Sequence, residues 1–210
     1  MTDTGPKWSR RKDDRPAEII EAALELFVLN GFAATKLTEV AQRAGVVKGT
    51  LYRYFDTKED LFRAAVRHLA TANLALVEHA VPIDGTVATV VPAMLRQVAR
   101  GVTGSRIPSI VRMVLAESRA FPDLATIWHD EVVSPILNGV AAIMAKGQES
   151  GEIRVGDPRL DALSVIGPMV TGVLYREVFR TSDDGWPSLD ALALQHAETI
   201  VRGLSPTGST

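Results

Sequence analysis

The chain has 210 residues, of which 46 % are hydrophobic and 23 % are charged, the balance of an ordinary globular protein. It has no cysteine, which excludes disulfides, thiolate metal sites and cysteine nucleophiles, and its four histidines are too scattered to suggest a metal site. The net charge is only −2. The uncharged stretch between Asp161 and Arg176 holds 14 residues, whereas a bilayer span needs about 20, and no apolar segment directly follows the basic N-terminus. We therefore expect a cytoplasmic protein without a secretory signal or membrane contact.

The N-terminal region is predicted to begin with a flexible arm followed by a helix. Residues 1–15 are polar and rich in basic side chains, a composition typical of a poorly ordered terminus. Pro16 suits the first turn of a helix, where its missing N–H costs nothing. Gly31 is expected to end that helix, because glycine adopts a positive φ at low cost.

Two short helices and a long one are predicted next. Thr35 or Thr38 is expected to cap the first short helix, and Gly45 ends it. The second short helix lies within residues 48–55. The long helix runs from residue 58 to about residue 79, after a break in the chain.

Helical periodicity continues through the remaining sequence. The predicted helices cover residues 85–100, 110–119, 123–149 (bent near Pro135), 159–180 and 189–204, and a polar tail follows at 205–210. No segment alternates as a strand would. The sequence therefore predicts an all-α protein of about nine helices.

The segment from residue 35 to residue 61 carries the clearest functional signal. Two short helices joined by a glycine-containing turn form a helix-turn-helix pattern. The residues left facing outward on the second helix are Lys48, Gly49, Thr50, Tyr52, Arg53 and Tyr54. Basic side chains neutralise phosphates or read guanine, hydroxyl groups donate to phosphate oxygens, and a glycine lets the backbone approach a duplex. This face therefore suits DNA.

Local charge agrees with that interpretation. Residues 33–58 hold five basic and two acidic residues, whereas residues 64–210 hold 12 basic and 15 acidic ones. The basic charge is thus concentrated on the motif. Composition alone nevertheless favours an ordinary solvated helical hairpin, because charged helix faces are common.

The order of residues between Pro16 and Val66, with the run GFAAT followed by EVAQRAGVVKGTLYRYFDTKEDLF, resembles the DNA-binding domain of the TetR family of bacterial transcriptional regulators. The resemblance implies a three-helix DNA-binding domain over residues 16–62, with the long helix continuing to about residue 79 as a connector. Residues 80–204 would then form the family's larger helical domain for ligand binding and dimerisation. That part is matched only by its helix count and by a looser pattern around AESRAFPDL.

Specific contacts follow from the resemblance. It implies that Lys48, Thr50, Tyr52 and Arg53 lie along the major groove. It also implies that Thr35, Tyr54 and Lys58 hold phosphates, with help from the dipole at the start of the long helix.

One residue departs from the family pattern. Val47 stands where the family usually has Ser or Thr, and valine cannot cap a helix with a side-chain oxygen, which costs about 1 kcal/mol. We therefore expect operator affinity or operator choice to differ. The arm over residues 7–15 either enters the minor groove or serves as a solubilising tail.

Large adaptable side chains in the C-terminal half are candidates for a ligand pocket. They are Met94, Met113, Phe121, Trp128 and Met169. Methionine and aromatic side chains tolerate varied ligand shapes, so a small apolar or aromatic effector is expected. Taken singly, each of these residues fits a plain role in the core somewhat better than a role in a pocket.

The last two helices are apolar on two sides, which indicates that one side faces a second subunit. The predicted interface residues are Ile166, Val170, Leu194, Ala197 and Val201, with Gly167 and Gly172 allowing close approach. The resemblance also implies such a dimer.

No nucleotide-binding, metalloprotease or hydrolase motif occurs, so no catalytic residue, metal site or cofactor is predicted. The sequence predicts a homodimeric transcriptional regulator that binds a double-stranded, pseudo-palindromic operator. A repressor released by a small apolar or aromatic ligand is the favoured form. The alternatives are a ligand-independent DNA-binding or architectural protein of the same fold, and an all-α enzyme that retains a helix-turn-helix.

Overall fold

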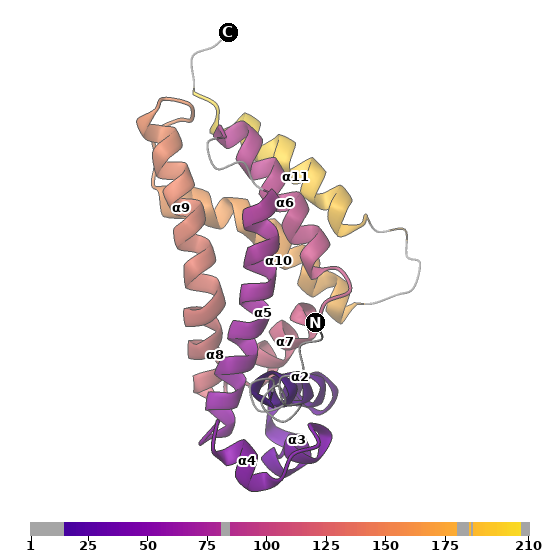
Figure 1. Ribbon diagram of the computed structural model, residues 1–210. Coiled ribbons are helices and arrows are strands. Elements are labelled where there is room, and N and C mark those ends of the chain that lie inside the picture. The colour runs from indigo at the N-terminus through magenta and orange to yellow at the C-terminus, as the bar shows by residue number, and fades with distance from the viewer. Residues whose placement is uncertain (1–14, 81–84, 180–184, 186, 207–210) are drawn as a thin grey trace, which may run out of the picture. The chain divides into compact units, whose positions relative to one another are not determined.

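In the computed structural model, the described part of the chain comprises residues 15–80, 85–179, 185 and 187–206, and every regular element in it is helical (Figure 1). The elements are α2 (Arg15–Ala34), α3 (Leu37–Arg43), α4 (Lys48–Tyr52), α5 (Lys58–Ala80), α6 (Val87–Val102), α7 (Ile107–Glu117), α8 (Pro122–Trp128), η1 (His129–Val133), α9 (Ser134–Glu149), α10 (Pro158–Val178) and α11 (Leu189–Leu204). The all-α prediction is confirmed for this part. Of the arm predicted over residues 1–15, residues 1–14 lie outside it and Arg15 is the first residue of α2, and the end of the tail at 207–210 also lies outside it.

The bend predicted near Pro135 takes the form of a widened turn. The expected helix over residues 123–149 is divided into α8, the π-helical turn η1 and α9, and Pro135 lies in the first turn of α9. Proline lacks an N–H group and its ring clashes with the preceding turn, so the helix changes its winding just before it. None of the helices in the described residues is long and apolar enough to cross a membrane.

The chain folds into two compact units whose boundary differs from the expected one. The first unit comprises residues up to His68 together with Met113–Trp128, and the second comprises Leu69–Arg112 together with the residues from His129 onward. The sequence predicted one continuous C-terminal domain over residues 80–204. The segment Met113–Trp128 instead belongs with the helix-turn-helix.

An aromatic cluster forms the core of the first unit. The rings of Phe27, Phe32 and Phe62 have centroids 5.6–5.7 Å apart, and all three side chains are fully buried. Phe121 packs its ring against Phe32 with a centroid distance of 5.3 Å in an edge-to-face arrangement. This contact brings residues from the second half of the sequence into the unit.

The corner between α2 and α3 depends on Gly31 and Thr35. Gly31 has φ 80° and ψ 173°, so the predicted positive-φ glycine is confirmed. The Thr35 side chain is only 1 % exposed, and its hydroxyl donates to the carbonyl of Gly31 at 2.7 Å. The expected cap by Thr35 or Thr38 is wrong, because Thr35 turns back to α2 and Lys36 is the N-cap of α3 without a side-chain bond.

Replacing Gly31 with alanine is expected to destabilise the protein by about 1–3 kcal/mol, because only glycine adopts this backbone conformation without strain. A Cβ at this position would also overlap the carboxylate of Glu117. Chemical denaturation measures the loss. Gly45→Ala is the matched control, because Gly45 also has a positive φ but open space around it, and an equal loss in both variants would contradict the steric part of this argument.

The second unit is built around α6, α9, α10 and α11, with α6 packed against α11 and α9 against α10 (Figure 1). Gly172 lets α11 approach α10 closely within one chain, because a Cβ there would meet the side chains of Leu189 and Leu192. Asp161 is buried and accepts hydrogen bonds from Arg154 at 2.8 Å and Gln148 at 3.0 Å. These bonds tie the loop between α9 and α10 to the core.

A side-chain cap starts α10. Asp157 accepts a hydrogen bond from the backbone N–H of Arg159 at 2.9 Å. The hydrogen bonds from the side chain and backbone of Arg159 lower the pKa of Asp157 below its ordinary value. The folded-state pKa is lowered, so the stabilisation is present above the ordinary carboxyl pKa and is lost as the pH falls through the lowered value.

Candidate nucleic-acid interface

The helix-turn-helix hairpin is held by a buried interior and a tight turn. Val40, Ala41 and Leu51 are fully or almost fully buried, and α3 packs against both α2 and α4. Gly45 has φ 65° in the turn between α3 and α4. The N–H of Val46 donates to the carbonyl of Ala41 at 2.9 Å, which closes that turn.

The outward face predicted for the second short helix is present on and beside α4. Lys48, Gly49, Tyr52 and Arg53 are exposed, whereas Thr50 and Tyr54 are half-buried. The ammonium of Lys48 lies 5.4 Å from the ring centroid of Tyr52, and the guanidinium of Arg53 lies 5.4 Å from that of Tyr54. The structure thus brings these residues together as two cation–aromatic pairs.

Space and charge on this face fit the approach of a duplex. Apart from the adjoining chain and helix backbone, no described atom lies within 4 Å of the position that a Cβ of Gly49 would take. Arg43, the basic residue at the end of α3, bonds to Glu25 of α2 at 2.7 Å. Lys48 and Arg53 are therefore the basic groups that α4 and its end offer to phosphates or base edges.

Val47 is the N-cap of α4, and its side chain makes no capping bond, as predicted. Its backbone carbonyl accepts a hydrogen bond from the N–H of Thr50 in the first turn of α4, at 2.8 Å. The side chain is 73 % exposed. An apolar group thus stands next to the polar face of α4.

Two of the residues that the family resemblance implies as phosphate contacts make hydrogen bonds within their own chain. The Thr35 hydroxyl is buried and bonds to Gly31 within its own chain. The ammonium of Lys58 donates to the carbonyls of Phe32 at 2.7 Å, Thr35 at 3.1 Å and Ala33 at 3.3 Å. An ammonium has three N–H groups, so these bonds engage all of them.

The start of α5 also differs from the expected phosphate-binding end. The hydroxyl of Thr57 accepts from the N–H of Asp60 at 3.0 Å, and the carboxylate of Asp60 accepts from the N–H of Thr57 at 3.1 Å. In this reciprocal cap, the backbone N–H groups of Thr57 and Asp60 both find acceptors, and the Asp60 carboxylate places a negative charge at the start of the helix. The Thr57-x-x-Asp60 spacing is the sequence signal for it.

The candidate pocket residues are divided between the two units. Met94 and Met169 are buried in the core of the second unit. Met113, Phe121 and Trp128 belong to the first unit, where Phe121 packs against Phe32. The segment Met113–Trp128 thus contributes to the core around the helix-turn-helix, and the ligand pocket stays a prediction. Among the described residues, no three His, Asp or Glu side chains gather as a metal site.

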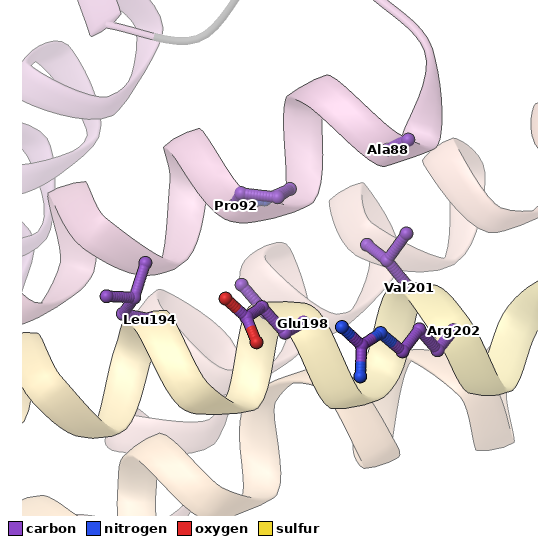
Figure 2. Close-up of a pocket in the computed structure, with 7 residues that line it drawn as sticks. Ala88, Pro92, Leu194, Glu198, Val201 and Arg202 are labelled. Atoms are coloured by element: carbon purple, nitrogen blue, oxygen red, sulfur yellow. The ribbon is translucent and has the colours of Figure 1, made fainter.

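A groove lies instead between α6 and α11 (Figure 2). It has a volume of about 280 Å³, and its lining residues are Ala88, Pro92, Leu194, Ala197, Glu198, Val201 and Arg202. Three of these, Leu194, Ala197 and Val201, are residues predicted for the dimer interface.

The predicted interface residues are unequally exposed. Leu194 is 53 % and Val170 is 45 % exposed, and Ile166 and Val201 are half-buried. Ala197 is only 3 % exposed, so its assignment to a subunit interface is corrected: its side chain is covered within one chain. The reason is that the buried side of α11 runs through Leu189, Ala193, Ala197 and Leu204.

Comparison with known proteins covers both parts of the chain. The family of bacterial regulatory proteins called tetR matches residues 19–65, and the family of tetracyclin repressor-like C-terminal domains matches residues 81–186. These matches join the helix-turn-helix and the helical region after it in one family pattern.

Relatives and solved structures carry similar names. The chain is 25 % identical over 159 residues to a fatty acid metabolism regulator protein of Bacillus subtilis, covering 75 % of this chain and 81 % of that protein. It is 36 % identical over 86 residues to an HTH-type transcriptional repressor of Mycobacterium tuberculosis, covering 39 % of this chain and 46 % of that protein. The fold is similar to that of the transcriptional regulator FadR from Bacillus subtilis in complex with stearoyl-CoA, with a TM-score of 0.73, 23 % identity, and 90 % and 98 % of the two chains covered.

Proposed function

Because the chain belongs to the tetR family of bacterial regulatory proteins, we propose that this transcriptional regulator is a homodimeric repressor which a small apolar ligand releases from its operator. The observation that carries the proposal is the exposed face of α4, where two cation–aromatic pairs surround a glycine open to approach. The name of the Mycobacterium tuberculosis relative supports repression rather than activation.

The face of α4 is suited to the major groove. Lys48 and Arg53 supply positive charge, and Tyr52 supplies a flat apolar ring with a hydroxyl donor. A dimer presents two such faces, and half-sites one helical turn apart are separated by roughly 34 Å along the duplex. The operator is therefore proposed to be pseudo-palindromic.

The outer surfaces of α10 and α11 support dimerisation. Leu163, Val170 and Leu194 are exposed although they are large and apolar. In the described part of the chain, no atom beyond the local backbone of α10 lies within 4 Å of a Cβ built on Gly167, so a partner helix has room to approach there. Exposed apolar residues gathered on neighbouring helices are typical of an association surface.

An acyl chain is the ligand class to test first. A relative named for fatty acid metabolism and a structural neighbour solved with stearoyl-CoA support this choice. Met94 and Met169 in the core of the second unit are adaptable side chains that tolerate varied apolar ligands. No resident cofactor is proposed.

The test begins by selecting duplexes from a random-sequence library with the full-length protein. Stearoyl-CoA, free stearate and a panel of aromatic acids are then titrated into the protein bound to the selected duplex. The expected result is release of the duplex with an affinity loss of about 5- to 150-fold, the usual range of coupling between two sites. Trp128 fluorescence, identified with a Trp128→Phe variant, is expected to change over the same concentrations.

Each component of the proposal has its own contradicting result. Enrichment of no sequence by the folded protein would contradict operator binding. Selection of a sequence with no release and no fluorescence change across the panel would favour the ligand-independent alternative. A ligand that binds without releasing the duplex does not distinguish the two states and would contradict ligand-released repression.

A further inference from the structure

The carboxylate of Glu117 bonds to the backbone of the corner between α2 and α3. Its Oε1 accepts from the N–H of Phe32 at 3.0 Å, and its Oε2 accepts from the N–H of Ala33 at 2.7 Å. Glu117 is the last residue of α7, 85 positions from Phe32 in sequence. Both carboxylate oxygens of Glu117 thus accept hydrogen bonds from the backbone of a segment that directly precedes the helix-turn-helix hairpin.

Lys58 provides the opposite charge at the same corner. Its ammonium donates to the carbonyls of Phe32, Ala33 and Thr35, and it lies 4.4 Å from the ring centroid of Phe32. The N–H groups of the corner therefore face a carboxylate, and its carbonyls face an ammonium. Charge-assisted hydrogen bonds of this kind are about twice as strong as neutral ones.

This corner is the connection through which α3 is attached to α2. Only Thr35 and Lys36 separate the end of α2 from the start of α3, and α3 in turn packs against α4. Gly31 forms the kink in α2 with a positive φ that glycine adopts without strain, and its missing Cβ leaves room for the Glu117 carboxylate. The corner is therefore connected through α3 to the helix that carries Lys48 and Tyr52.

We infer that Glu117 is a positioning residue for DNA recognition: its carboxylate holds the corner between α2 and α3 in the arrangement that operator binding requires. The inference rests on the proposed binding face of α4. It assigns a role in operator binding to a side chain of α7, outside the helix-turn-helix sequence. The Glu117 carboxylate acts through backbone geometry rather than through contact with the duplex.

The test compares Glu117→Gln with Glu152→Gln in the full-length protein. Glu152 is a matched control, because its Oε1 accepts from the backbone N–H of Ala88 at 3.1 Å in the second unit. Both variants remove one negative charge and leave a side chain of the same length. Affinity is measured for the duplex selected by the wild-type protein and for a random-sequence duplex, and hydrogen exchange is measured at Phe32 and Ala33.

Glu117→Gln is expected to weaken binding to the selected duplex by about tenfold or more, because apparent affinity falls with the population of the competent arrangement. Binding to the random duplex is expected to stay within about twofold of the wild type, since that binding depends on charge rather than on helix placement. Exchange at Phe32 and Ala33 is expected to rise. Glu152→Gln is expected to show none of these changes, and Glu117→Asp is expected to restore part of the selected-duplex affinity.

An unchanged affinity for the selected duplex in Glu117→Gln would overturn the inference, whether or not exchange at the corner rises. An equal loss for both duplexes would also overturn it, because such a loss reports general destabilisation. If Glu117→Gln does not fold, the same comparison is made with Glu117→Asp, where wild-type selectivity despite faster exchange overturns it. Failure of the wild-type protein to select any sequence contradicts the proposed function instead, so the two failures are distinguishable.

Discussion

Replacing Tyr52 with alanine is expected to weaken binding to the selected operator by about 1–3 kcal/mol, the usual cost of removing one specific contact with a base or phosphate. Tyr52 is exposed on α4, and its ring also supports the ammonium of Lys48. The variant thus removes a contact and releases a neighbouring cation. Its side chain lies outside the buried core, so the thermal unfolding midpoint is expected to change little.

Lys48→Ala is expected to weaken binding by a similar amount and to affect the salt dependence as well. A lysine that neutralises one phosphate contributes about one unit to the slope of log affinity against log salt concentration. Arg96→Ala is the control, because Arg96 is an exposed basic residue on α6 in the second unit. Gel-shift titrations at several salt concentrations measure all three variants. Unchanged operator affinity in folded Tyr52→Ala and Lys48→Ala proteins would contradict the assignment of this face.

Replacing Leu194 with glutamate is expected to dissociate the dimer. Leu194 is large, apolar and exposed on α11. In a twofold-symmetric interface, each subunit would bury one glutamate introduced at this position. Burying an unpaired charge costs about 3–5 kcal/mol, which corresponds to a rise of about a hundredfold or more in the dimer dissociation constant. Val170→Glu on α10 is expected to act in the same way.

Analytical ultracentrifugation measures the association state of each variant. Val155→Glu is the control, because Val155 is a highly exposed apolar residue in the loop between α9 and α10. It introduces the same charge outside the proposed interface and is expected to leave the dimer intact. A full dimer in both Leu194→Glu and Val170→Glu would place the interface on other elements. Loss of the dimer is also expected to abolish cooperative binding of the two half-sites.

Several local features were predictable from the sequence because they depend on neighbouring residues. Gly31 and Gly45 both have the positive φ expected at their turns. The hairpin of α3 and α4, with Gly45 in its turn, and its outward residues follow from helical periodicity, since the spacing of apolar residues determines which face is buried. Val47 lacks a side-chain cap in the structure, as its apolar side chain dictates.

Side chains with more than one possible partner were not predictable in this way. Lys58 and Thr35 have the chemistry of phosphate contacts, yet both bond to backbone carbonyls of their own chain. Ala197 fits either side of an apolar helix, and the packing of α11 places it in the core. In each case the residue type allows two roles, and the choice depends on groups that only folding brings near.

The sequence by itself determined the helical fold, the helix-turn-helix and the face of α4, because periodicity, glycine positions and residue chemistry act over a few neighbouring residues. Only the tertiary structure decided that Met113–Trp128 joins the first unit and that Glu117 bonds to Phe32 and Ala33. These contacts join residues far apart in the chain. The groups that meet in these contacts are backbone N–H groups and aromatic rings, which are common throughout the chain. No local sequence pattern therefore indicates which of them will come into contact.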